Sequence, residues 1–325
     1  MSLWKASLST SAMALGERRG GTLGGLLVDL WRRPWMSVGR DQLLDEYRAA
    51  ARLPVAGLAG LSAARLRRLL WRCFLDVPAY RDRWRGRLVP ARLDDASDLS
   101  ILDGLPMPAP DERAARPSAF VAAGAATVDV ARWTAGAAVV VDADALARRE
   151  AVRRRAEDGA EPMSVWGAEA GLAPRRLTDD EIAALWRQAR RVLSLPGGSA
   201  EELLATADRR RRVQVVIARG GLGGAARLAA ALGAELRHFV VAPEVGLLAA
   251  TCASGRLHVP SDHLLIEIVD DAGVPLPAGA SGAVCVTDLG NHAAPYVRQR
   301  LPERGRLGLP CSCGQPFPVL ELEGS

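Results

Sequence analysis

Three cysteines and one histidine in the last quarter of the chain are the residues whose types best suit a defined chemistry. Cys252 precedes His258 by six residues, and Cys311 and Cys313 form a C-x-C pair in a turn rich in Gly and Pro. Three thiolates and one imidazole make a complete tetrahedral zinc set, with no open position for a substrate. We therefore expect a structural zinc ion that ties this region to the end of the sequence. The alternative is a small core residue at Cys252 and an ordinary C-x-C turn.

A glycine-rich turn between a predicted strand and a predicted helix suggests a second kind of chemistry. Gly221, Gly223 and Ala226 fit the spacing G-x-G-x-x-A, which brings backbone N–H groups and a helix N-terminus close to a pyrophosphate. Glu244, at the end of the next predicted strand, would then accept a ribose hydroxyl. The pattern predicts, as one alternative, an NAD(P)- or flavin-dependent oxidoreductase. Against it, no further strand–helix units follow, and such turns are also common as purely structural features.

Lysine is almost absent from the sequence. Lys5 is the only lysine among the 42 basic residues, and the others are arginines. Arginine cannot replace lysine where a deprotonatable amine is needed. The sequence therefore disfavours Schiff-base chemistry, a phosphate-binding loop that ends in Gly-Lys, and a kinase-type strand lysine.

Six short motifs follow one another in the last 85 residues. They read V-A-P-E-V-G at 241–246, L-H-V at 257–259, L-I-E-I-V-D at 265–270, G-A-V-C-V-T-D-L at 282–289, P-Y-V-R at 295–298 and C-S-C-G at 311–314. In order and spacing they resemble the phenylacetate-CoA ligase branch of the adenylate-forming enzymes. The segment D-V-P-A-Y-R at 76–81 is similar to that family's early Val-Pro-x-Tyr-Arg segment, and residues 99–106 are similar to its following linker.

The resemblance implies an α/β fold, the large domain of an adenylate-forming enzyme. Such a domain has a helical N-terminal region, a layered parallel-sheet core and a small C-terminal β subdomain. We place these parts at residues 1–118 (helical region and linker), 119–245 (core) and 246–325 (β subdomain with the zinc site). The family activates acyl or aryl carboxylates with ATP and magnesium and transfers them to a thiol. Some similar ligases carry a structural zinc in the corresponding segments.

The phosphate loop departs from the family's pattern. The family reads T-S-G-T-T-G, in which hydroxyls and amides surround the triphosphate. Here residues 134–139 read T-A-G-A-A-V, so Thr134 and Gly136 are what remains of an ATP site. The sequence also ends about where the family's hinge would begin, so we expect the mobile C-terminal domain with its catalytic lysine to be missing. Binding of ATP and magnesium is expected to be weak or absent.

Three further positions carry remnants of the family's catalytic groups. Glu244 keeps the magnesium-associated position, and Arg298 lies in the P-Y-V-R motif. Glu303, after Pro302, replaces the Asp that would hold the ribose. The acid of the family's Gly-Glu segment is missing at residues 220–221. Because adenylation needs preorganised cations and amides around the α-phosphate, we expect the chain to lack autonomous activity.

Hydrophobic periodicity and turn residues predict the elements that would position these groups. Helices are expected over residues 40–53, 61–74 (ended by residues 77–80), 143–157, 179–193 and 223–232. Strands are expected over residues 119–123, 128–133, 138–141, 213–218, 236–242, 264–269, 282–287 and 319–322, and a Pro-rich linker over 105–117. Strand, helix and strand over residues 213–242 predict a parallel pair with a crossover.

Composition excludes several classes of protein. The 325 residues are 49% hydrophobic, yet no apolar run reaches the roughly 20 residues of a membrane span. The formal net charge of +5 is mild and spread along the chain, so we predict no nucleic-acid partner. Five cysteines, an odd number, argue against a disulfide framework. With no secretory signal visible, we expect a cytoplasmic protein.

These features favour a diverged ligase-like pseudoenzyme with an AMP-binding-like domain. It would bind an acyl or aryl small molecule, or its thioester, as an accessory component of carboxylate activation or biosynthesis. One alternative is an enzyme of acyl transfer or CoA ligation that needs a partner domain, a carrier protein or a preactivated thioester. The NAD(P)-dependent oxidoreductase remains the other.

Overall fold

The computed structural model describes the chain in segments: residues 34–87, 99–109, 111–125, 128–129, 140–141, 143–156, 163–164, 182–183, 186, 192–196, 200–207, 213–219, 222–242 and 244–323. The chain forms two compact units, residues 1–42 and 43–325, and all the sheets of the described residues lie in the second. None of the described helices is both long enough and apolar enough to cross a membrane.

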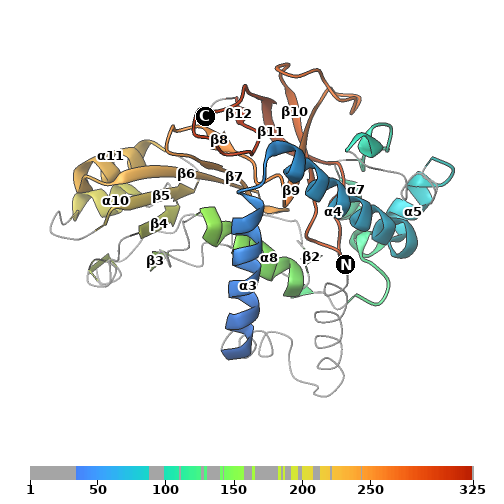
Figure 1. Ribbon diagram of the computed structural model, residues 1–325, viewed down its shortest axis with the longest axis horizontal. Coiled ribbons are helices and arrows are strands. Elements are labelled where there is room, and N and C mark those ends of the chain that lie inside the picture. The colour runs from blue at the N-terminus through green and yellow to red at the C-terminus, as the bar shows by residue number, and fades with distance from the viewer. Residues whose placement is uncertain are drawn as a thin grey trace. The chain divides into compact units, whose positions relative to one another are not determined.

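A six-stranded mixed sheet is the largest element of the second unit (Figure 1). Its strands, in spatial order, are β3 (Met163–Ser164), β4 (Val192–Pro196), β5 (Val215–Arg219), β6 (Glu235–Ala242), β7 (Gly246–Thr251) and β8 (Leu257–His258). The pairs from β3 to β6 are parallel, and β6–β7 and β7–β8 are antiparallel. Four successive buried residues open β5, as expected for a parallel strand covered on both faces.

Helices cover both faces of this sheet. On one face α10 (Ala200–Ala205) and α11 (Gly223–Leu232) pack against β4 and β5 in a single apolar cluster. On the other face, Ala151 and Val152 of α8 (Ala143–Ala156) share a cluster with Tyr47 of α3 (Pro34–Ala50) and with residues of β4 to β7. The helix α11 ends where Gly233 adopts a positive φ of 65° and donates to the last carbonyls. The result is a helix–sheet–helix layering.

A four-stranded antiparallel sheet follows in the chain. Its order is β12 (Leu320–Leu322), β11 (Gln299–Leu307), β10 (Gly282–Asp288) and β9 (Leu264–Val269). Residues of β9 to β12 share one apolar cluster with β7 and β8, so the two sheets have a common core. The expected boundary between the core and the β subdomain, at residues 245 and 246, falls between β6 and β7. These two strands pair within one sheet.

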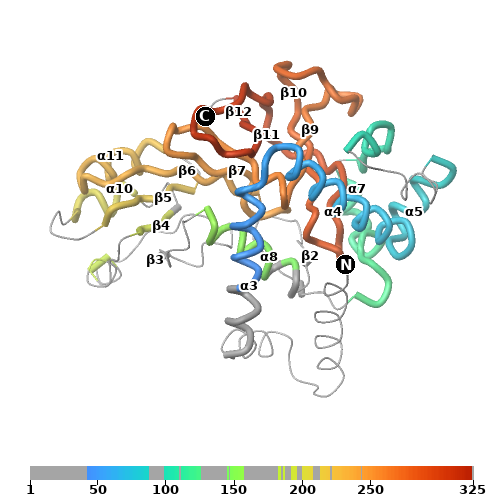
Figure 2. Tube along the Cα trace, in the orientation of Figure 1, coloured from blue at the N-terminus to red at the C-terminus, as the bar shows by residue number. Residues whose placement is uncertain are grey.

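The helical segments pack on the four-stranded sheet. They are α4 (Val55–Asp76), α5 (Pro78–Trp84), α7 (Glu112–Ala115) and two short 3₁₀ helices, Ser100–Leu102 and Pro117–Phe120. The helix α4 ends at Asp76 because Pro78 lacks an N–H and restricts Val77 to extended backbone. Its buried face packs with residues of β9 and of the segment after β10, so α4 lies beside the C-terminal strands (Figure 2).

Several expected elements are confirmed and others are wrong. The parallel β5–β6 pair with its α11 crossover, the helix at 143–157 and the strand at 264–269 are present. The expected strand over 119–123 is wrong, because Pro117 starts a 3₁₀ helix there. The expected helix over 179–193 cannot reach 193, since that residue lies in β4. The expected linker over 105–117 contains the helix α7.

The short strands β1 (Val128–Asp129) and β2 (Val140–Val141) pair antiparallel. They lie within the strands expected over 128–133 and 138–141, whose remaining parts fall outside the described residues.

Candidate functional site

Two regions of the second unit bring chemically active side chains together. The first is a group of four potential metal ligands: Cys252, in the turn after β7, His258 of β8, and Cys311 and Cys313 between β11 and β12. One ligand atom from each residue lies within 4.8 Å of the others. These four residues, expected from their spacing, therefore form a site that can bind a metal ion.

The distances in this group suit a tetrahedral ion. The Sγ atoms of Cys252 and Cys311 are 3.7 Å apart, and Sγ of Cys313 is 3.4 Å from Nε2 of His258. Two sulfur atoms that each lie about 2.3 Å from one tetrahedral zinc are about 3.8 Å apart. A hydrogen bond from the backbone N–H of Cys313 is the largest cause that lowers the pKa of the Cys311 thiol, to about 6, which favours the thiolate that a metal requires, whereas burial raises the pKa of Cys313.

The orientation of His258 is set by the other nitrogen of its ring. Its Nδ1 lies 2.8 Å from the carbonyl oxygen of Phe317, so the ring donates there and directs Nε2 at the cysteines. An isolated bridge pairs His258 with Val319, and the N–H of Val259 donates to Pro318. The ligand group thus joins the β7–β8 end of the mixed sheet to the segment that leads into β12.

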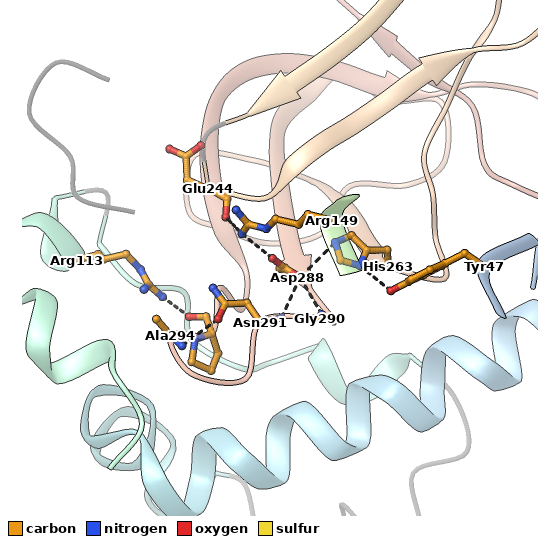
Figure 3. Close-up of polar contacts among 10 residues, drawn as sticks. Tyr47, Arg113, Arg149, Glu244, His263, Asp288, Gly290, Asn291 and Ala294 are labelled. Atoms are coloured by element: carbon orange, nitrogen blue, oxygen red, sulfur yellow. Dashed lines mark hydrogen bonds and ion pairs between the residues drawn. The ribbon is translucent and has the colours of Figure 1, made fainter. Parts of the chain in front are cut away.

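The second region is centred on Asp288, at the end of β10 (Figure 3). Its wholly buried carboxylate accepts a hydrogen bond from Arg149 of α8 at 2.9 Å and from the N–H groups of Gly290 and Asn291 at 2.8 and 3.2 Å. Burial opposes its charge, but the Arg149 guanidinium holds the pKa of Asp288 below its usual value. Asp288 therefore acts as an ionised link between α8 and the following turn.

Arg149 also holds the turn that contains Glu244. The same terminal nitrogen of Arg149 donates to the backbone carbonyl of Glu244, as Figure 3 shows. Glu244 is half-buried. The residue predicted at the magnesium-associated position thus lies in a turn whose backbone is bonded to a buried ion pair.

His263 lies next to Asp288 and reaches back to α3. Its Nδ1 is 3.1 Å from the hydroxyl of Tyr47, and its Nε2 is 3.8 Å from Asp288 Oδ1. Burial lowers the pKa of His263 to about 4, so the ring is neutral near pH 7. A second buried ion pair lies close by, between Arg155 of α8 and Asp262, with bonds of 2.6 and 3.0 Å. Two salt bridges therefore attach α8 to the loops before β9 and after β10.

Arg298, predicted as a remnant of a catalytic group, is buried and fully bonded. Its guanidinium donates to Glu267 of β9 and to the carbonyl oxygens of Leu105 and Gly273. Its backbone has a φ of 49°, which is rare for a residue other than glycine. These bonds connect the segment after β10 to the helical region and to the β9–β10 turn, so Arg298 serves the packing of the site.

Glu303 lies in a distortion of β11. Ala283 faces Arg304 and Cys285 faces Arg300, so three residues of β11 oppose one residue of β10. This bulge accommodates Pro302, which has no N–H to donate to the ladder. Burial, together with the negative charge of Glu244, raises the pKa of Glu303. The charge of Glu244 therefore adds to the effect of burial on Glu303.

Arg113 of α7 borders the same region and was not expected from the sequence. Its guanidinium lies 3.9 Å from the ring centroid of Tyr296 and 4.5 Å from that of Phe120, and it donates to the carbonyl of Pro295. Tyr80 donates to the same carbonyl at 3.0 Å. No sequence signal identifies Arg113, Arg149, Asp288 or His263 as neighbours, because they are brought together by long-range packing alone. Thr134 and Gly136, and the glycines at 220 and 221, lie outside the described residues.

Comparisons with solved structures identify the fold. An open conformation of 2-hydroxyisobutyryl-CoA ligase in complex with 2-HIB-AMP and CoA aligns with a TM-score of 0.66 and 17% identity, over 84% of this chain and 75% of that one. The same ligase in its postadenylation state aligns with a TM-score of 0.68 and 18% identity, over 84% of this chain and 68% of that one. The chain therefore has the α/β fold of an adenylate-forming enzyme. These matches do not support the oxidoreductase alternative. No family model and no curated protein matches the sequence.

Proposed function

We propose that this protein is a diverged relative of the phenylacetate-CoA ligase branch that binds an acyl or aryl group, as carboxylate or thioester, without forming an adenylate by itself. The supporting observation is a contrast within one site. The backbone around Glu244 is held by Arg149 and Asp288. In contrast, burial and the negative charge of Glu244 raise the pKa of Glu303, which weakens Glu303 as an ionised acceptor for a ribose hydroxyl.

The fold supports the proposed ligand class. The ligase with the same fold has been solved with an acyl adenylate and with CoA. We transfer only the acyl group and its thioester to this chain, because Lys5 is its single lysine and the sequence of the phosphate loop keeps one hydroxyl. In biosynthesis such a protein would act as an accessory component, and its free cysteines suit a cytoplasmic location.

We further propose that the metal bound by Cys252, His258, Cys311 and Cys313 is zinc. Three thiolates favour a soft tetrahedral ion, and the four side chains complete its coordination. Its role would be structural, since no position is left for a substrate or water.

A second candidate function is a partner-dependent acyl transferase or CoA ligase. The fixed turn at residue 244 favours it, because a backbone bonded to the Arg149–Asp288 pair holds the Glu244 side chain at one place. A carrier protein or a partner domain would then supply the missing groups.

Calorimetric titration separates these functions. The purified chain is titrated with phenylacetyl-CoA, with phenylacetate and with Mg-ATP, and AMP formation is measured in a mixture of phenylacetate, CoA and Mg-ATP. We expect binding of the acid or the thioester and no AMP. AMP production by the chain alone would refute the proposal.

A variant of Glu244 and a matched control test whether Glu244 belongs to the binding site. Glu244→Gln should lower the affinity of any Mg-ATP binding and leave the melting temperature near that of the parent. Glu235→Gln, which changes an exposed acid of β6 by the same charge, is the control. Acyl transfer that appears only when phenylacetyl-CoA and a carrier protein are both supplied would favour the second function.

A further inference from the structure

Two thiols of the group of four potential metal ligands lie close enough to react with each other. The Sγ atoms of Cys252 and Cys311 are 3.7 Å apart, although the residues are 59 positions apart in the chain. The two sulfur atoms of a disulfide are about 2.05 Å apart, so each Sγ has to move by less than about 1 Å for the bond to form. The contact that suits a metal ion therefore also suits a covalent bond.

Backbone pairing holds the two segments that carry these thiols. In the turn after β7, the N–H of Cys252 donates to the carbonyl of Arg256 at 2.9 Å, and the Arg256 guanidinium bonds to Glu321 of β12 at 2.7 Å. Cys311 lies between β11 and β12, which pair antiparallel, and β12 adjoins β8 (Figure 1). The contact between the two thiols is therefore set by the fold of both segments.

Exposure distinguishes these thiols from the other cysteines of the chain. The three cysteines of the group are partly exposed, and the turns around them are open to solvent at residues 253–255 and 312. Cys73 and Cys285 lie in the apolar core with no exposed surface. Because oxidation of a cysteine depends on access to its sulfur, a small oxidant in solution reaches the group and is kept from the two core thiols.

Cys313 is placed differently from the other two cysteines of the group. Its Sγ lies 3.4 Å from Nε2 of His258, and the ring of His258 is fixed by the contact of Nδ1 with the carbonyl of Phe317. One residue separates Cys313 from Cys311, so a disulfide between these two would close a very small ring and depart from the preferred geometry. The geometry therefore favours a bond between Cys311 and Cys252.

We propose that Cys252 and Cys311 form an oxidation site at which hydrogen peroxide converts the two thiols into a disulfide. One thiol attacks a peroxide oxygen, the O–O bond breaks, and a sulfenic acid and one water are formed. The second thiol attacks the sulfenic sulfur, the S–O bond breaks, and a second water leaves with the thiol proton. In total the two sulfurs lose two electrons, and the peroxide takes up these electrons and the two thiol protons.

The disulfide and the proposed metal site are alternative states of the same residues. The disulfide removes two of the four potential ligands and leaves Cys313 and His258, which are too few for a structural zinc ion. Oxidation therefore releases a bound metal and replaces it by a covalent link between the same two segments. This inference goes beyond the proposed acyl binding, and formation of the disulfide does not itself require that a metal binds.

The test is a titration of the full chain, as purified, with hydrogen peroxide. Free thiols are counted after denaturation, cross-linked peptides are identified by mass spectrometry without reduction, and released zinc is measured with a coloured chelator. We expect the count to fall from five thiols to three, with the Cys252 peptide joined to the Cys311 peptide, and dithiothreitol to restore five.

The outcomes separate this inference from the earlier proposals. A chain that forms the disulfide and releases no zinc would refute the zinc proposal alone, and failure of acyl binding would refute the proposed function alone. If the folded parent chain forms no link between Cys252 and Cys311, or links Cys311 to Cys313 instead, this inference is wrong.

Variants identify the two sulfurs. Cys252→Ser and Cys311→Ser should each abolish the cross-link and leave a sulfenic acid that dimedone traps. Cys285→Ala is the matched control, because it removes one thiol from β10, and its count should fall from four to two with the same cross-link. The peptide map of the parent chain decides the question even if a variant does not fold. A persisting loss of two thiols in Cys252→Ser would contradict the assignment.

Discussion

Replacement of Arg155 by alanine tests how firmly α8 is attached to the loop before β9. The guanidinium makes two bonds to the carboxylate of Asp262, which has no exposed surface, and it also lies 4.7 Å from the ring centroid of Phe317. Removal of one partner from a buried pair leaves an uncompensated charge and costs about 3–5 kcal/mol. We expect Arg155→Ala to lower the free energy of unfolding by about that amount.

The control for this variant is an exposed ion pair in the same unit. Arg48 and Asp45 lie 3.2 Å apart on α3, with side chains 42% and 73% exposed. An exposed pair of this kind contributes about 0–1 kcal/mol, so Arg48→Ala should change stability little. Urea unfolding followed by circular dichroism measures both variants.

A double variant separates the pair from the packing around it. Arg155→Ala with Asp262→Ala removes both charges, so it should be less destabilised than the sum of the two single variants. If Arg155→Ala costs no more than Arg48→Ala, or if the two single effects simply add, the reasoning about the buried pair is wrong.

Three further predictions concern the potential metal ligands, the two histidines with a lowered pKa, and a close backbone approach. Cys313→Ser, or treatment of the parent chain with a chelator, should remove about one equivalent of zinc per chain and lower the melting temperature. Elemental analysis that finds no metal in freshly purified protein would contradict this prediction. His263 and His292 have pKa values of about 4 in the folded chain, below the unfolded value, so their contribution to stability is complete above about pH 6.5 and is lost as the pH falls toward 4. Urea unfolding between pH 7 and 4 should show this slope, and replacement of both histidines by asparagine should reduce it. Gly305→Ala should destabilise the chain, because the new Cβ would lie 2.3 Å from a backbone oxygen of the neighbouring strand. The Cβ of Gly223→Ala would meet nothing within 4 Å, so this variant should be neutral or stabilising. Thermal unfolding of both variants checks this difference in the sign of the stability change.

Local patterns were sufficient for some elements and not for others. The helix α11 and the strand β6 are predictable because a small apolar stripe, a terminal glycine and a following β-rich run each point to one structure. The helix expected over residues 179–193 overlaps the start of β4, since a short apolar run does not distinguish a helix from a strand by periodicity. The strand β11 was missed because Pro302, Gly305 and its many charges are unfavourable for a strand, and pairing with two neighbours overrides that preference.

Some residues of the candidate site could likewise be predicted from the sequence, and others could not. The four potential metal ligands were predictable because thiols and an imidazole are chemically distinctive wherever they lie in the chain. The ion pair between Arg149 and Asp288 joins residues 139 positions apart, and arginine is the commonest charge in this sequence, so no local signal marks that one. Arg149 and Asp288 become neighbours only when the chain folds.

The order in which the four potential metal ligands are synthesised has a consequence for the newly made chain. Cys252 and His258 leave the ribosome more than 50 residues before Cys311 and Cys313 do. At about 5–20 residues per second, the first two ligands wait on the order of 3–10 s for the other two. During that interval the Cys252 thiol has no complete metal site, and the edge at β8 has not yet acquired its contact with Val319. If these residues bind zinc as proposed, we expect the Cys252 thiol to be more open to oxidants or competing metals in the nascent chain than in the finished protein.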